Sequence, residues 1–363
     1  MKHNKIKVIS FSVFVLLFSL IMIFGPKSDI SFGERRKLAV FPEISRKNIT
    51  SGKFMSGFES YFLDHFPGRD KLRSIKSVSE FYLFSKNDYQ KLYIENGYIS
   101  KLEYPIREKS VEHASKKFNA VYNKYLSSGN FNVYFSIIPD KNYFLTPENN
   151  YPSIDYEKFI DIFKEKNSFM KYIDITDTLD ISDYYRTDTH WKQENLIETA
   201  NKLALGMNIE LNEEYEKIKV NAPFYGVYHG RSALPLKPDE IYYLTNETIE
   251  NCTVFNFEEN KEMSVYDLSK ADSDDPYEIF LSGPLSLITI ENKNAESDRE
   301  LIIFRDSFGS SIAPLFIEAY SKITLVDIRY ISSEVLDRFI SFENQDILFL
   351  YSTLVLNNAE TIK

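Results

Sequence analysis

Two short segments of this chain carry residue types that can perform acyl-transfer chemistry together. Asp188 stands two residues before His190, and the chain's only tryptophan, Trp191, follows directly. More than a hundred residues later, Ser307 lies between an apolar run and Gly309. A serine nucleophile, an imidazole base and a carboxylate that orients the imidazole are the components of an acyl-transfer triad. The two segments can therefore supply all three roles, although neither segment would indicate them alone.

The surroundings of Ser307 favour an exposed position. A strand is expected to end at Phe304 and a helix to begin near Ser310, which places Ser307 at the carboxyl end of a strand, where α/β sheets form their sites. A nearby helix N-terminus can stabilise an oxyanion, and Gly309 lets the backbone approach a substrate closely. The alternative is structural, with Asp306 and Ser307 only capping the helix.

The spacing of Asp188 and His190 also permits two interpretations. Residues two apart lie on the same side of an extended segment but not of a helix, so we expect an extended segment if the carboxylate orients the imidazole. Alternatively, Thr187, Asp188 or Thr189 caps a helix that begins near Trp191.

Several other polar residues stand where they can border such a site. Asp140 and Lys141 follow the end of an apolar strand candidate. Tyr228, His229 and Arg231 lie in an expected loop, which either lines a substrate groove or forms a plain turn. The five histidines lack metal-ligand spacing, so no metal site is expected. The sequence also offers no glycine-rich phosphate loop, and no cofactor is expected.

Short apolar strands alternate with helices from residue 107 onward. Strands are expected at 131–138, 172–175, 300–304, 322–327 and 346–351, and helices at 109–126, 155–166, 310–320 and 332–341. Continuous apolar strands between helices predict a mainly parallel sheet covered on both faces. Residues 208–298 carry shorter β-like pieces among acidic loops, which predicts an inserted β-rich subdomain or a long excursion between two strands.

The N-terminal region differs from the rest. Residues 8–24 form an uncharged apolar segment preceded by three lysines, long enough to span a bilayer. A cleaved signal peptide begins in the same way, but the segment is long for one and lacks a small-x-small cleavage site, which favours an uncleaved signal anchor. An extended stalk follows. A helical stripe of Phe54, Phe58, Tyr61, Phe62 and Phe66 then predicts core packing, and Pro67-Gly68 ends that helix.

Charge and cysteine content narrow the classes of partner. The chain has 43 basic and 53 acidic residues, and without the three leading lysines the exported part carries a net charge of −13. This balance argues against nucleic acid or an anionic membrane surface as the main ligand, whereas a neutral or cationic glycan is compatible. Cys252 is the only cysteine, so an intramolecular disulfide is excluded.

The paired motifs resemble those of the DHHW family of exported bacterial proteins, which is related to the alginate O-acetylation proteins. The likeness rests on Arg186–Trp191 and Arg305–Gly309. It extends to Glu34–Ala39, Phe66–Asp70, Ile138–Lys141, Phe224–Gly226 and Leu234–Pro238. Thr189 replaces the first histidine of the DHHW name, but Asp188 and His190 still match.

This resemblance implies an SGNH-hydrolase-like three-layer α/β/α fold with a permuted triad. Ser307 would be the nucleophile, His190 the general base and Asp188 its orienting partner. Arg305 and the backbone at Ser307 would lie on the oxyanion side, and Arg186, the first residue of the matched motif, would contact substrate. The family adds acetyl groups to cell-surface polysaccharide, with the acetyl donor delivered by a multi-spanning membrane acyltransferase.

The sequence thus predicts a single-pass membrane protein whose main domain is extracytoplasmic. Residues 1–26 would form the cytoplasmic flank and anchor, 27–106 a stalk and helical region, and 107–363 the catalytic domain with the insertion at about 208–298. The expected activity is O-acetylation of a surface or secreted polysaccharide. A carbohydrate acetylesterase with the same triad and a non-catalytic glycan-binding component of an acetylation complex are the alternatives.

Overall fold

Two units of unequal size make up the computed structural model, which describes every residue except 1, 32–33, 35, 85–89, 150 and 213. One unit comprises Met1–Gln90 with His229–Lys237, and the other comprises Lys91–Tyr228 with Pro238–Lys363. Contacts thus group residues 91–106 with the larger unit, whereas the sequence places a boundary after residue 106. Hairpin β3 (Leu92–Glu95) and β4 (Tyr98–Lys101) lies in that stretch.

The larger unit is built on an eight-stranded sheet in the order β10-β9-β11-β13-β12-β14-β5-β6. The strands from β13 to β6 run parallel, whereas β11, β9 and β10 extend the sheet through antiparallel pairing. The predicted, mainly parallel sheet is therefore present. The strands are β5 (Asn132–Ile138), β6 (Lys171–Tyr172), β9 (Thr253–Asn256), β10 (Lys261–Met263), β11 (Leu287–Glu291), β12 (Glu300–Arg305), β13 (Lys322–Val326) and β14 (Asp346–Ser352).

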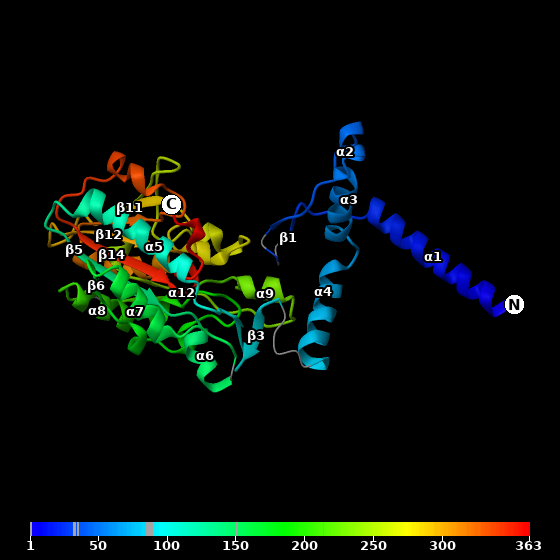
Figure 1. Ribbon diagram of the computed structural model, residues 1–363, viewed down its shortest axis with the longest axis horizontal. Coiled ribbons are helices and arrows are strands. Elements are labelled where there is room, and N and C mark those ends of the chain that lie inside the picture. Colours follow the sequence, from blue (N-terminus) through cyan, green and yellow to red (C-terminus); the bar gives the residue numbers. More distant parts are fainter. Residues whose placement is uncertain (1, 32–33, 35, 85–89, 150, 213) are drawn as a thin grey trace. The chain divides into compact units, whose positions relative to one another are not determined.

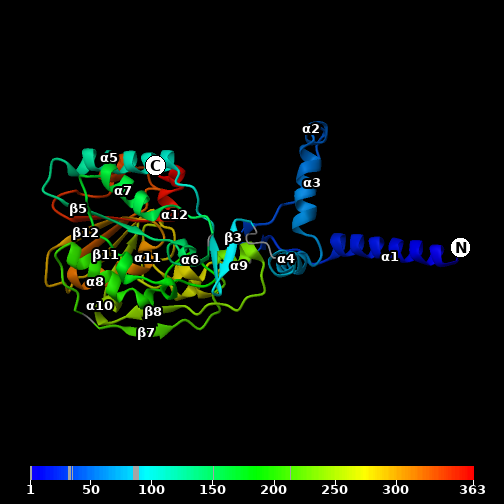
Figure 2. The same ribbon diagram turned by 60° about the horizontal axis from the view of Figure 1, so that its bottom comes forward.

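Helices cover both faces of this sheet, as Figure 2 shows, with α5 and α7 on one side and α8 on the other. Helices α5 (Glu108–Val121) and α7 (Tyr156–Lys166) bury apolar side chains against β5 and β14. Helix α8 (Ile197–Gly206) and the 3₁₀ helix η8 (Ala313–Ala319) close the opposite core. Successive strand residues point to opposite faces, so apolar strands of this kind require cover on both sides.

Short helices fill the connections. They are α6 (Asn142–Asn149), α9 (Val227–Ser232), α10 (Glu247–Glu250), α11 (Gly309–Ile312), α12 (Thr353–Leu356), the π-helix η2 (Tyr122–Leu126) and the 3₁₀ helices η3 (Thr176–Thr178), η4 (Ile181–Asp183), η5 (Gln193–Asn195), η6 (Leu268–Asp272), η7 (Pro276–Ile279), η9 (Ser333–Arg338) and η10 (Ala359–Thr361). The sequence predicts longer helices at 310–320 and 332–341, where the structure forms mostly 3₁₀ turns.

Residues 208–298 contain strands, as expected, but their arrangement differs from a separate subdomain. Strands β9, β10 and β11 join the main sheet, and only β7 (Glu216–Lys219) and β8 (Tyr242–Thr245) pair with each other apart from it. An inserted β-rich subdomain is therefore not established, and the region mostly widens the sheet.

The smaller unit begins with α1 (Lys2–Phe24). The segment of α1 from residue 5 to residue 22 has a mean hydropathy of 2.1 and is long and apolar enough to cross a membrane. Short strands β1 (Ile30–Ser31) and β2 (Arg36–Lys37) follow, and then α2 (Arg46–Thr50), α3 (Lys53–Asp64), α4 (Arg69–Val78) and the π-helix η1 (Ser79–Leu83) (Figure 1). Helix α3 ends before Pro67, as predicted. The predicted core packing of its aromatic stripe is present in part: Tyr61 is buried against Phe41, with ring centroids 5.3 Å apart, whereas Phe58 and Phe62 remain exposed.

Candidate active site

The turn that holds Ser307 follows the central strand β12. Asp306 shapes this turn, because its carboxylate accepts hydrogen bonds from the Phe308 N–H (3.0 Å) and from the backbone and hydroxyl of Ser352 (2.8 and 2.7 Å). Helix α11 begins at Gly309 with Phe308 as its N-terminal flank and without a side-chain cap. The capping role considered for Ser307 is therefore not what its hydroxyl does.

Gly309 is required by the packing of this turn. A Cβ at this position would lie 2.7 Å from the Cβ of Arg305, a distance that real Cβ contacts do not reach. The glycine lets the turn fold back onto the end of β12, and the close approach of a substrate expected from the sequence stays a prediction.

The segment from Arg186 to His190 forms a tight loop of bends, not the extended segment that its spacing suggests. The Tyr185 N–H donates to the His190 carbonyl (3.1 Å), which closes the loop. One oxygen of Asp188 accepts from the backbone N–H of His190 (3.0 Å) and from its ring nitrogen Nδ1 (2.6 Å). The carboxylate thus fixes both the loop and the imidazole. The expected helix-capping alternative is wrong, since η5 begins only after Lys192.

The two segments meet at the imidazole. His190 Nε2 lies 2.7 Å from Ser307 Oγ, while its other nitrogen faces Asp188. Asp188 is completely buried and His190 almost so, whereas Ser307 is half-buried. A serine that can pass its proton to a base already oriented by a carboxylate is the arrangement required for nucleophilic acyl transfer.

Trp191 connects the two halves of the site. Its indole N–H donates to the Phe308 carbonyl (3.2 Å) and to the Ser311 hydroxyl (2.8 Å). Because Trp191 follows His190 and Phe308 follows Ser307, these bonds fasten the loop that holds His190 to the turn that holds Ser307. The sequence shows the tryptophan but not this function, since its partners lie far away in the chain.

Tyr277 is a site residue that sequence reasoning missed. Its ring stacks on the imidazole of His190, with centroids 3.9 Å apart and planes inclined by 9°. Phe308 contacts the same imidazole at 4.9 Å. The Tyr277 hydroxyl donates to Ser311 Oγ (2.8 Å), and burial raises the pKa of this phenol well above its ordinary value. The phenol therefore stays neutral and serves as a fixed aromatic wall.

The segment Gly226–Val227 and the Asp239 carboxylate hold the loop of Asp188 in place. The second oxygen of Asp188 accepts from the Val227 N–H (2.7 Å). A Cβ on Gly226 would lie 2.3 Å from the Cβ of Asp188, so only glycine permits this approach. Asp239 accepts from the N–H groups of Arg186 (2.9 Å) and Thr187 (2.8 Å) and from the Thr187 hydroxyl (2.6 Å). The motif around Gly226 is visible in the sequence, whereas Asp239 gives no local signal.

Asp140 and Lys141 lie under the site rather than on its surface, since both are buried. Asp140 accepts from Thr353 Oγ1 (2.6 Å) and the Tyr156 hydroxyl (2.9 Å), and burial raises the pKa of its carboxyl. Lys141 Nζ donates to the Tyr185 carbonyl (3.0 Å), directly before the loop from Arg186 to His190. Burial lowers the pKa of this lysine to about 7, against the smaller opposing effects of Asp188 and Asp239. Their burial argues against the expected substrate contact.

Arg305 is also completely buried. Its guanidinium donates to the Leu285 carbonyl (3.3 Å) and weakly to the Asp306 carbonyl (3.4 Å), and it faces Asp327 at 3.9 Å. Burial lowers the pKa of Arg305. Its side chain therefore supports the turn of Ser307 from within the protein, and the expected contact with substrate or oxyanion stays a prediction.

The remaining predicted contacts are divided between the two units. Arg186 is exposed at the start of the loop that ends at His190, and Tyr228 is buried with its ring 5.0 Å from Lys141 Nζ. His229 and Arg231 group with the smaller unit, where Arg231 donates to the Gln90 carbonyl (2.9 Å). Of the predicted substrate-binding residues, Arg186 is thus the exposed one that belongs to the same loop as His190.

Solved structures with the same fold are known, although no family model and no curated protein matches the sequence. A DHHW family protein from Eubacterium siraeum is 21% identical, with a TM-score of 0.59 over 75% of this chain and 93% of that chain. Bacillus cereus PatB1 is 16% identical, with a TM-score of 0.59 over 75% of this chain and 98% of that chain, and it has also been solved with a sulfonyl adduct. The O-acetyltransferase domain of Pseudomonas putida AlgJ is 12% identical, with a TM-score of 0.46 over 73% and 92% of the respective chains. The resemblance to the DHHW family is confirmed at the level of the fold.

Proposed function

We propose that this protein is a membrane-anchored, extracytoplasmic O-acetyltransferase that modifies a cell-surface or secreted polysaccharide. The observation that carries the proposal is the continuous contact from Ser307 Oγ through His190 to Asp188, at 2.7 and 2.6 Å. The fold shared with a DHHW family protein and the apolar helix α1 are consistent with it.

The chemistry follows from the three side chains. Ser307 Oγ attacks the carbonyl carbon of an acetyl donor while His190 Nε2 accepts its proton, and the resulting imidazolium is stabilised by Asp188. The leaving group takes that proton as the carbonyl re-forms, which leaves acetyl-Ser307. A sugar hydroxyl then gives its proton to Nε2 and attacks the acetyl group, which releases the acetylated glycan and regenerates Ser307. The donor would be supplied by a multi-spanning membrane acyltransferase.

Two alternatives differ from this proposal at defined points. An acetylesterase would use the same triad with water as the acceptor, so exclusion of water during the second step separates the two activities. A non-catalytic glycan-binding component would leave Ser307 unacylated.

The test uses the full chain in detergent with a chromogenic acetyl ester. We expect acetyl release by the wild type, an acetyl adduct on Ser307 by mass spectrometry, and a loss of roughly 10³-fold or more in Ser307→Ala. Ser310→Ala, a neighbouring serine that does not contact His190, should retain activity. A sulfonyl fluoride should modify the wild type at Ser307 and leave Ser307→Ala unmodified.

The acceptor is then tested with a defined oligosaccharide. An acetylated sugar supports the transferase, whereas acetate release without acetylated sugar supports the esterase. Equal rates for wild type and Ser307→Ala, without an adduct, would overturn both and leave the glycan-binding role.

A further inference from the structure

Helix α4 in the smaller unit has its polar face packed and its apolar face bare. Arg69, Arg73 and Ser77 follow one another at intervals of four, so they lie on one side of the helix. Leu72, Ile75 and Val78 lie on the opposite side, and Ile75 is 62% exposed. A helix at a protein surface normally buries its apolar side, so the reversed arrangement calls for a partner.

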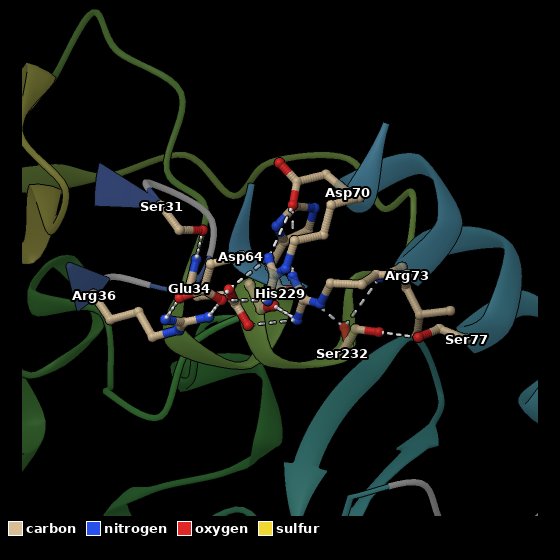
Figure 3. A network of polar contacts seen from close by, with 12 residues as sticks. Ser31, Glu34, Arg36, Asp64, Asp70, Arg73, Ser77, His229 and Ser232 are labelled. Atoms are coloured by element: carbon tan, nitrogen blue, oxygen red, sulfur yellow. Dashed lines mark hydrogen bonds and ion pairs between the residues drawn. The ribbon is translucent and has the colours of Figure 1, made fainter. Parts of the chain in front are cut away.

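The polar face is occupied by defined contacts, as Figure 3 shows. The Glu34 carboxylate forms ion pairs with Arg69 (2.7 Å), Arg73 (3.3 Å) and Arg36 (3.1 Å). Burial by itself would raise the pKa of Glu34. The three guanidinium groups outweigh this effect, so the pKa of Glu34 is lowered. Arg73 also donates to the Gly230 carbonyl (3.0 Å), and Ser77 donates to the Ser232 carbonyl. These bonds fix the rotation of α4 and keep its apolar side outward.

Helix α3 also carries exposed apolar side chains. Met55, Phe58, Phe62 and Leu63 are all exposed, which together with Leu72, Ile75 and Val78 of α4 we call the apolar face of the smaller unit. Seven large apolar side chains on two consecutive helices are more than the scattered exposed residues that a soluble surface carries.

The turn between α3 and α4 touches α1 within its membrane-length segment. The ring of Phe66 lies 5.7 Å from that of Phe18, and Lys27, three residues after the end of α1, donates to the Tyr61 hydroxyl of α3. At 1.5 Å per residue, Phe18 is only about 6 Å from the last residue of that apolar segment, Met22. If α1 crosses a bilayer, the start of α4 therefore lies at the boundary between hydrocarbon and headgroups.

The charge of this region fits the same surface. Residues 27–84 carry 11 basic and 7 acidic residues, a net charge of +4, whereas residues 85–363 carry 29 basic and 46 acidic residues, a net charge of −17. The negative net charge of the whole chain thus conceals a positively charged region at residues 27–84. Lys71 and Lys76 are exposed on α4 next to the apolar side chains, as is Asp70. A cavity of about 660 Å³ at the turn is lined by Ile21, Met22, Arg69 and Lys71, and also by Asp64 and Asp70. Apolar side chains bordered by cations match the boundary of acyl chains and phosphates.

We infer that the apolar face of the smaller unit lies on the outer surface of the lipid bilayer, with Ile75 at the boundary of the acyl chains and the lysines at the phosphates. This inference rests on the membrane anchor in the proposed function. It makes α3 and α4 an interfacial platform, so the protein would be held to the membrane by a surface as well as by a single span.

The test measures contact with lipid directly in the full chain. Cys252 is replaced by serine, and single cysteines are placed at Ile75, at Phe14 in α1 and at Leu205, an exposed residue of the larger unit. Each is labelled with a small fluorophore, and the protein is reconstituted into vesicles with brominated acyl chains. We expect strong quenching at positions 75 and 14 and little at 205, since interfacial helices bury their apolar side about 5–10 Å deep.

The outcomes separate the inference from the anchor. Quenching at position 14 without quenching at position 75 overturns the interfacial platform and leaves the anchor intact. The same result is expected if a protein, and not lipid, covers Ile75. Absence of quenching at both positions overturns the anchor as well. In vesicles with anionic lipid, Lys71→Gln and Lys76→Gln should each weaken the quenching at position 75. We expect each to lower the ratio of membrane-bound to unbound α4, which this quenching reports, by about fivefold. Lys217→Gln should leave the quenching unchanged.

Discussion

The aromatic ring of Tyr277 lies flat against the imidazole of His190, at 3.9 Å between centroids and 9° between planes. The tyrosine hydroxyl reaches Ser311, which also receives the indole N–H of Trp191. The imidazole is thus held by Asp188 at its edge and by Tyr277 at its face, so it can rotate only if one of these contacts breaks.

Replacing Tyr277 tests how much the stacked wall contributes to catalysis. Tyr277→Leu should lower kcat about 3- to 10-fold, because a favourable aromatic pair is worth about 0.5–1.5 kcal/mol and its loss frees the imidazole to reorient. Tyr277→Phe keeps the ring and should recover most of that loss. Steady-state kinetics with the acetyl ester provide the measurement. Tyr320→Phe, a buried tyrosine that bonds to Asp346, is the control. Equal kcat for Tyr277→Leu and wild type would show that stacking does not position the base.

Gly226→Ala tests the close approach behind Asp188. The added methyl would lie 2.3 Å from the Asp188 Cβ and 2.4 Å from its Cα, so the catalytic loop must move. A misplacement of about 1 Å costs roughly 100-fold in rate, and we expect a loss of that size in kcat. The fall should appear in single-turnover acetylation of Ser307.

Gly206→Ala provides a matched control for that substitution. A methyl there would lie 2.6 Å from the Ile173 side chain, on α8 and away from the triad. This variant should lose stability through overpacking while acetylation of Ser307 proceeds at the wild-type rate. Similar rate losses in the two variants would contradict a specific role for Gly226.

Lys141 predicts a pH dependence of stability. Its pKa in the folded protein is about 7, below the value of 10.5 for a free lysine, because it is buried. Between about pH 7 and pH 10 the unfolded chain therefore binds one more proton, and the free energy of unfolding rises with pH by up to about 1.4 kcal/mol per unit from this group. Below pH 7 both states are protonated, and the cost of burying the charge is fully present.

Urea unfolding of wild type and Lys141→Met across that range measures this contribution. The variant should lack the rise that wild type shows, whatever the effect of lost hydrogen bonds to the Tyr185 carbonyl on its absolute stability. The exposed Lys217→Met should follow the wild-type slope. Parallel slopes for wild type and Lys141→Met would show that the buried amine does not change its protonation in this range.

Residue type and short-range pattern predicted the main elements well. Helix α7 begins within one residue of the expected start, since Asp155 caps it through the Lys158 N–H. Strands β5, β12, β13 and β14 lie where continuous apolar runs in the sequence predict strands. The 3₁₀ geometry of η8 and η9 was missed, because contacts with the sheet override the local helical preference there.

By itself, the sequence determined the elements of the sheet, the apolar N-terminal helix and the three residue types that can form a triad. These depend on periodicity and on side-chain chemistry, both of which are local. Only the tertiary structure decided that His190 meets Ser307, that Trp191 fastens their two loops, and that Tyr277, Asp239 and Gly226 hold them. It also decided that Lys141 and Arg305 are buried and that Phe58 and Phe62 of α3 stay exposed. The physical reason is that such contacts join residues far apart in the chain, so they depend on how the sheet and its connections pack.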